Sequence, residues 1–81
     1  MKEITFKEYC RLPDEIRKNF TGIVNWNEGG QSFLQNGKMH RTDGPAVIYA
    51  NGHVKYWIDG TKTTKEGQEV YYNLHKLKGL I

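Results

Sequence analysis

The sequence predicts an α+β fold: an antiparallel β-meander of about four strands, flanked by N-terminal and C-terminal helices. The strongest observation is an internal repeat, because the turn residues Gly29 and Gly52 are 23 residues apart and their surroundings match at the same spacing. In this register Val24 corresponds to Val47 and Trp26 to Tyr49. A period in this range is typical of repeated supersecondary units that share one core.

The length of 81 residues predicts one domain. We divide it into a helical N-terminal segment 1–21, a β-repeat meander 22–62 and a C-terminal helix 63–81. The chain holds two Trp, five Tyr and three Phe. Because each aromatic ring buries roughly 150–250 Å², these residues are expected to supply most of the core.

The N-terminal segment reads as two short helices. Thr5 and Glu8 have the spacing of a capping box, in which a hydroxyl and a carboxylate satisfy free backbone N–H groups. Cys10 falls on the apolar face of this helix and is expected to be a small core residue. In the second helix Ile16 and Phe20 lie four residues apart, which predicts that both face inward.

The repeat region reads as strands separated by glycine turns. Turns are expected at Glu28–Gly30, Asn36-Gly37, Asn51-Gly52 and Asp59-Gly60. Asn51-Gly52 is the strongest hairpin signal, since a type I′ turn needs positive φ at both central residues. In the last strand Lys55 and Trp57 share one face, opposite Tyr56, because side chains alternate along a strand.

The C-terminal segment reads as a helix over residues 63–78. Thr63 and Glu66 repeat the capping-box spacing, and Gly79 is the expected C′ residue. One apolar stripe has helical spacing and consists of Val70, Leu74, Leu77 and Ile81. The helices at both ends of the chain are expected to cover the same face of the sheet.

Charge and composition limit the kinds of partner and environment that the sequence predicts. The net charge is +3 and the isoelectric point about 9.1, which is mildly basic and fits RNA or an acidic protein partner. The single cysteine excludes an internal disulfide and fits a reducing cytoplasm. No apolar run reaches the roughly 20 residues that span a bilayer, so no membrane is expected.

The sequence contains no recognisable catalytic set. His40, His53 and His75 lie far apart and lack metal-ligand spacing. The glycines match no phosphate-binding loop. We therefore expect no enzymatic activity, no cofactor and no metal site.

Two surfaces are candidate binding sites, and each has a structural alternative. His40–Ala46 is either a polar recognition site or the brace between the two repeat units. Lys55 and Trp57 are either an exposed strip that stacks a base and holds a phosphate, or a tryptophan covered by a helix. The candidate partner- or RNA-binding residues are Lys38, His40, Arg41, Lys55, Trp57, Lys62, Lys76 and Lys78.

Three stretches carry a resemblance: Leu12-Pro13-Asp14-Glu15, then Asn19-Phe20-Thr21-Gly22 and Trp26, then Asn36-Gly37-Lys38-Met39-His40-Arg41-Thr42-Asp43-Gly44-Pro45-Ala46. Together they resemble small proteins of T4-like bacteriophages with Asn-Gly-Lys-x-His-Arg-x-Asp-Gly-Pro-Ala repeats, and more distantly the MORN-variant repeats of antitoxin-type proteins. The second copy departs from this pattern at 60–64, so the repeat is expected to end there.

The resemblance implies a non-enzymatic, phage-encoded inhibitor in the host cytoplasm. Its expected partner is a host toxin or defence protein, such as a toxin–antitoxin ribonuclease, with RNA as a further component. Toxin-inhibitory factors that neutralise the ToxN ribonuclease together with RNA are one such kind. The alternatives are a stand-alone RNA-binding module and a repeat-type adaptor. The target and the oligomeric state stay open at this point.

Overall fold

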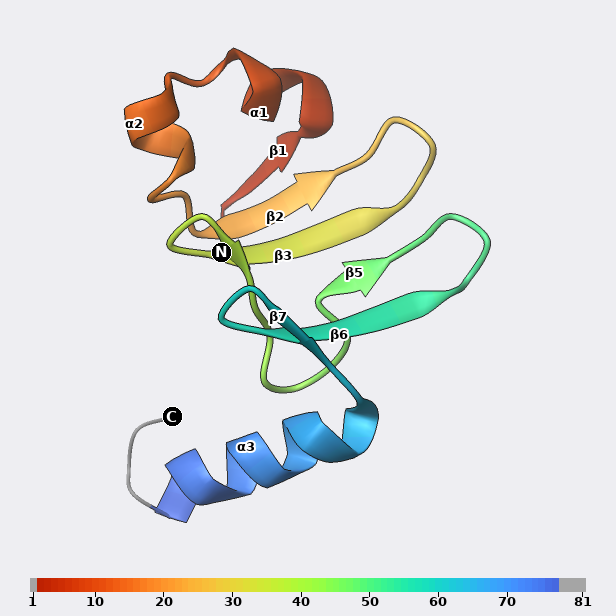
Figure 1. The fold of residues 1–81 in the computed structure, drawn as a ribbon. Coiled ribbons are helices and arrows are strands. Elements are labelled where there is room, and N and C mark those ends of the chain that lie inside the picture. Colours follow the sequence, from red (N-terminus) through yellow and green to blue (C-terminus); the bar gives the residue numbers. More distant parts are fainter. Residues whose placement is uncertain (1, 78–81) are drawn as a thin grey trace.

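The computed structural model describes residues 2–77 and contains helices and a mixed sheet (Figure 1). The elements in chain order are β1 (Glu3–Thr5), α1 (Phe6–Arg11), α2 (Asp14–Arg17), β2 (Gly22–Asn25), β3 (Gln31–Gln35), β4 (Lys38–Met39), β5 (Val47–Ile48), β6 (Val54–Ile58), β7 (Thr61–Thr63) and α3 (Lys65–Leu77). The α+β class and the C-terminal helix are therefore confirmed.

The sheet has seven strands, so the expectation of about four was too low. Their order is β1-β2-β3-β5-β6-β7, and β4 pairs with β3. All pairs are antiparallel except β1 with β2, which is parallel. β1 lies where the sequence indicated helix. Its residues instead complete the edge of β2, where the Ile23 amide donates to the Lys2 carbonyl at 2.7 Å, because free edge groups favour an added strand.

The N-terminal helices are shorter than expected. The capping box of Thr5 and Glu8 is present, with bonds of 2.8 and 3.1 Å. Phe20 is buried as predicted, but Ile16 is 51 % exposed and Cys10 is also exposed. Those two inward placements were wrong, since helices of six and four residues present too little surface to bury a whole apolar face.

The repeat is confirmed by the strand pairing. β6 follows β3 by 23 residues, and the pair Leu34↔Met39 recurs as Trp57↔Lys62. The loops match too: Gly29 donates to the Trp26 carbonyl in the first unit, as Gly52 donates to the Tyr49 carbonyl in the second. Each unit is therefore a hairpin followed by a tight turn and a short third strand.

The turn types differ from the prediction at one place. Asn36 and Gly37 have φ of 51° and 77°, as a type I′ turn requires, and Asp59-Gly60 repeats this geometry. Of Asn51 and Gly52, only the glycine has a positive φ. Because Gly52 donates to Tyr49 and Tyr49 donates to the His53 carbonyl, this loop is a longer turn closed by a glycine bulge.

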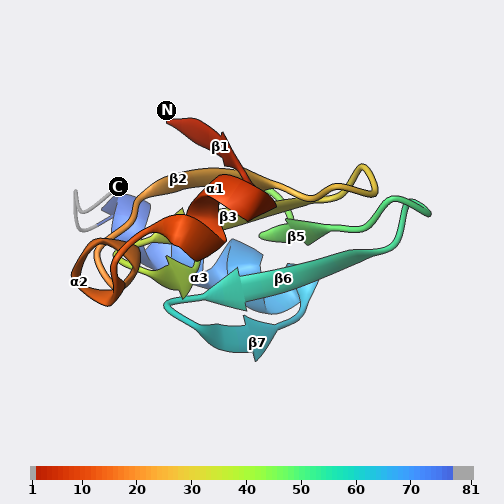
Figure 2. The same ribbon diagram turned by 90° about the horizontal axis from the view of Figure 1, so that it is seen from above.

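The helices lie over opposite faces of the sheet, which corrects the expectation that they share one. α1 and α2 lie at the β1–β2 end and α3 at the β6–β7 end (Figure 1), so that in the view from above α1 is nearest the viewer and α3 lies behind the strands (Figure 2). Phe6 of α1 packs at the face that carries Ser32, whereas Tyr56 meets Gln68 of α3 on the other side. We call the first side the groove face.

α3 packs through polar and aromatic residues. Its N-terminus is capped by Thr64, whose hydroxyl accepts from the Gly67 amide at 3.0 Å, and not by Thr63, which belongs to β7. Gln68 is buried, while Val70 and Leu74 are 59 % and 51 % exposed. The stripe of Val70 and Leu74 thus points away from the sheet. The side chain of Leu77, together with Lys78, Gly79 and Ile81, lies outside the described residues.

Candidate functional site

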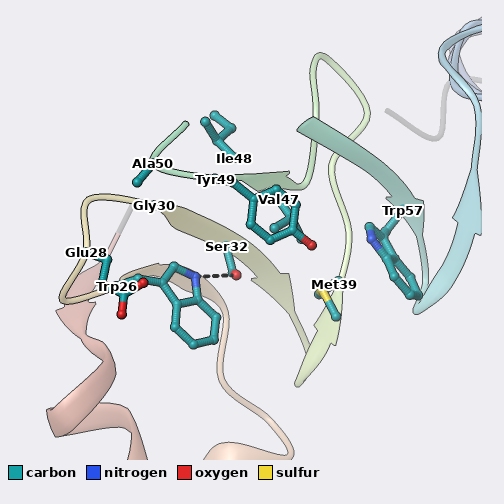
Figure 3. A pocket seen from close by; sticks show the side chains of 10 residues that line it. All are labelled: Trp26, Glu28, Gly30, Ser32, Met39, Val47, Ile48, Tyr49, Ala50 and Trp57. Atoms are coloured by element: carbon teal, nitrogen blue, oxygen red, sulfur yellow. Dashed lines mark hydrogen bonds between the residues drawn. The ribbon is translucent and has the colours of Figure 1, made fainter. Parts of the chain in front are cut away.

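An aromatic groove of about 410 Å³ lies on the groove face, between the two repeat units (Figure 3). It forms because β3 and β5 pair across the units, which places the loop of each hairpin beside the other. The groove is lined by Trp26, Glu28, Gly30, Ser32, Met39, Val47, Ile48, Tyr49, Ala50 and Trp57. Most of these side chains are apolar, so the groove suits an apolar group with a few polar contacts.

Trp26 is held in place at one end of the groove. Its indole Nε1 donates to Ser32 Oγ at 2.8 Å (Figure 3), and its ring stacks on Phe6 of α1 at 4.5 Å between centroids. It remains 40 % exposed, and Tyr49 is 46 % exposed. These two rings occupy equivalent positions of the two repeat units, and a rigid exposed aromatic is a typical anchor for a partner.

Trp57 lies at the other end of the groove and is half-buried. Among residues 2–77 its indole Nε1 has no hydrogen-bond partner, although the atom is buried. A buried donor without an acceptor costs about 1–3 kcal/mol. The structure therefore places Trp57 in the groove and not beneath a helix, and it leaves one polar atom there unsatisfied.

Two of the candidate lysines lie beside Trp57. Lys62 is its direct partner across β6 and β7, and Lys55 lies two residues away on the same strand. Residues that pair directly across antiparallel strands share a face, so all three are on the groove face. Tyr49 and Trp26 were not among the site residues predicted from the sequence, although their correspondence in the repeat was a signal that could have found them.

His40 belongs to the interior contacts of the second unit. Its Nδ1 accepts from the Asp59 amide at 3.0 Å, and its ring meets the edge of Tyr71 at 6.0 Å. The side chain is only 12 % exposed. Its position between a turn and α3 supports the bracing alternative for this residue.

Arg41 is also engaged within the chain. Its Nε bonds Asp43 at 2.9 Å, and its guanidinium lies 4.1 Å above the Phe33 ring. Gln68 of α3 donates to the Arg41 carbonyl at 2.6 Å and also bonds the carbonyl of Gly44. The segment His40–Ala46 thus joins the two units to α3, as the bracing alternative expects.

Lys38 and Lys76 are described by the structure but do not line the groove. Lys38 is exposed, and its aliphatic chain passes beside Gly60. Lys76 is exposed on α3, with its ammonium 5.8 Å from the centre of the Tyr72 ring. Lys78 lies outside the described residues. Of the seven candidates within residues 2–77, only Lys55, Trp57 and Lys62 are brought together on the groove face.

Two further features concern the described part of the chain. Within residues 2–77, no three His, Cys, Asp or Glu side chains gather closely enough to hold a metal ion. The helices in that range include none that is both long and apolar enough to cross a bilayer.

Tyr71 links the stability of the α3 interface to pH. Burial raises the pKa of Tyr71 above its ordinary value of 10.0, and the Asp59 carboxylate raises this pKa further. The folded state therefore keeps this proton when the unfolded state has lost it. We expect the free energy of unfolding to be unaffected by this group below about pH 10 and to fall as the pH rises above it.

Urea denaturation between about pH 9 and about pH 11 measures this effect. Tyr71→Phe removes the ionisable hydroxyl and is expected to flatten the alkaline decline. An equally steep decline in Tyr71→Phe would assign the loss to other groups.

Comparison of the chain with protein-family models, curated proteins and solved structures finds no match.

Proposed function

We propose that this protein is a non-enzymatic inhibitor that binds a host defence protein, with a toxin–antitoxin ribonuclease as the expected class of target. The observation that supports this proposal is the aromatic groove. It holds two exposed rings, Trp26 and Tyr49, on a sheet face that α3 does not cover. Trp, Tyr and Met are enriched at protein interfaces, where a few aromatic anchors carry most of the binding energy.

The charges beside Trp57 favour an acidic partner surface at that end of the groove. Lys55 and Lys62 flank Trp57 on the groove face. Acidic side chains of a partner would meet these ammonium groups at the rim, where such pairs chiefly raise the association rate. An apolar side chain of the partner would fill the groove itself.

RNA is the second candidate ligand, because Lys62 and Trp57 are direct neighbours across the strands. An aromatic ring beside an ammonium group can stack a base and hold its phosphate. In that case binding falls steeply with salt, since counterions are released from the phosphates. The experiment below separates the two ligands.

The test measures cleavage of an RNA substrate by a purified ToxN-type ribonuclease while this protein is added. The wild type is expected to suppress cleavage once it reaches the concentration of the enzyme. The double variant Trp26→Ala and Tyr49→Ala is expected to need at least about tenfold more protein, because truncating interface anchors costs about 1–2 kcal/mol each. Ile16→Ala is the control, since Ile16 is also an exposed apolar residue but lies on α2.

Unchanged cleavage at a large excess of wild-type protein would contradict the ribonuclease target. Equal inhibition by the wild type and the double variant would move the contact away from the groove. To examine RNA, the immobilised protein captures its partner from host lysate before and after ribonuclease treatment. If ribonuclease treatment of the lysate abolishes capture of the partner, the result would favour the alternative of an RNA-binding module.

A further inference from the structure

The repeat reveals one strand position that is filled in the first unit and open in the second. On the side away from β2, β3 pairs with two strands: β4 at its C-terminal end and β5 at its N-terminal half. On the side away from β5, β6 pairs with β7 through Tyr56, Trp57 and Ile58. No strand within residues 2–77 pairs there with its N-terminal half.

The open positions are Val54 and Lys55. They correspond to Gln31 and Ser32, which pair with Ile48 and Val47 of β5. In the first unit the chain runs from β3 into β4 and then returns beside β3 as β5. In the second unit the chain runs from β6 into β7 and then enters α3 (Figure 1), so no strand within residues 2–77 takes the corresponding place beside β6.

The backbone of Val54 faces this opening. The carbonyls of His53 and Lys55 accept from Tyr49 and Ala46, and therefore point toward β5. Backbone groups alternate sides along a strand, so the N–H and C=O of Val54 point to the open edge. The side chain is 40 % exposed. Unpaired groups of this kind are a template for an added strand.

We propose that the Val54–Lys55 edge binds an extended segment of the partner protein, which pairs antiparallel with β6 in the way that β5 pairs with β3. This inference rests on the proposed function, because it names how the host protein is held. Strand addition supplies affinity through main-chain hydrogen bonds, and the alternating side chains supply specificity.

The register defines the chemistry of the segment. The residue opposite Lys55 lies on the groove face, as Val47 does opposite Ser32, so an acidic side chain there pairs with the ammonium group. The next residue lies opposite Val54 on the other face, which favours a β-branched apolar side chain such as that of Ile48. A second copy of β6 does not fit as well, since its sequence Val-Lys-Tyr-Trp-Ile has no acidic residue.

The probe is the acetylated, amidated peptide Ala-Glu-Ile-Tyr-Ala, which is residues 46–50 of this chain with Val47→Glu. Amide hydrogen exchange of the whole, isotope-labelled protein is followed by NMR as the peptide is added. At saturation we expect the Val54 amide to exchange at least about tenfold more slowly, because it becomes hydrogen-bonded. Lys55→Glu is expected to weaken binding by at least about threefold, because it removes the cross-strand charge pair and places two negative charges opposite each other.

The matched control is the same peptide with a methyl group on the amide nitrogen of isoleucine. Phe33 donates to the Ala46 carbonyl in the first unit, and hydrogen-bonded pairs alternate along a ladder, so the isoleucine amide is one that bonds the edge. We expect the methylated peptide to give no protection of Val54. Equal binding of both peptides, or no protection of Val54 at millimolar peptide, would overturn the strand addition.

The edge and the proposed function can fail separately. If Val54 is not protected while the ribonuclease is still inhibited, the edge inference alone is overturned. If Val54 is protected but no ribonuclease is inhibited, the edge inference holds and the proposed target is overturned.

Discussion

Replacing Gly37 with alanine is expected to lower the free energy of unfolding by about 2–4 kcal/mol. Gly37 has φ of 77°, which alanine adopts only with strain. A Cβ atom there would also lie 2.7 Å from the carbonyl carbon of Lys18 and closer still to its oxygen. Both atoms are backbone, and the Gly37 amide donates to the Phe20 carbonyl at 2.9 Å, so neither segment can move away without losing this bond.

Chemical and thermal denaturation measure the loss, which for a domain of this size corresponds to a melting temperature about 10–20 °C lower. Gly52→Ala is the matched control, because Gly52 also has positive φ, 90°, but its Cβ would meet nothing within 4 Å. That variant is expected to lose only about 1 kcal/mol. Equal losses in the two variants would show that the contact of the β3–β4 turn with Lys18 is unimportant.

Replacing Trp57 with alanine is expected to weaken binding of the host protein by about 2 kcal/mol, which is roughly 30-fold in the dissociation constant. Trp57 forms one end of the aromatic groove, and Lys62 pairs beside it. Truncation removes the ring that a partner would cover and also opens the end of the groove. Calorimetric titration of the purified ribonuclease against each variant measures the change.

Tyr72→Ala is the control for Trp57→Ala. Tyr72 is also half-buried, but it belongs to α3 and lies by Tyr56 on the opposite face of the sheet. Both variants lose aromatic packing, whereas only Trp57→Ala is expected to lose affinity. An equal loss of affinity in the two variants, with circular dichroism unchanged, would indicate that the groove is not the contact surface.

Much of the β-region could be predicted because its signals are local. Alternation along β6 places Lys55 and Trp57 on one face, and the Asp59-Gly60 turn brings Lys62 beside them. The groove itself could not be predicted from these signals. It depends on the pairing of β3 with β5, in which Ser32 lies opposite Val47, and that contact closes only after the chain between the units has folded back.

The helices show the opposite case. The stripe of Val70 and Leu74 has the spacing of a buried face, yet both side chains are exposed. Gln68 is buried instead, because its amide donates to the carbonyls of Arg41 and Gly44 in the linking segment. An apolar stripe at helical spacing indicates which residues share a face of the helix. It does not indicate which face packs against the rest of the chain.

By itself the sequence determined the repeat, the positions of its turns and the α+β class, because glycine geometry and strand alternation act between neighbouring residues. Only the tertiary structure decided which faces the helices cover, where the groove forms and which edge of β6 has no partner strand within residues 2–77. These features depend on hydrogen bonds between residues distant in sequence, such as the Gln68 amide with the Arg41 carbonyl. A buried carbonyl must find a donor wherever the folded chain brings one, and no local pattern records which donor that is.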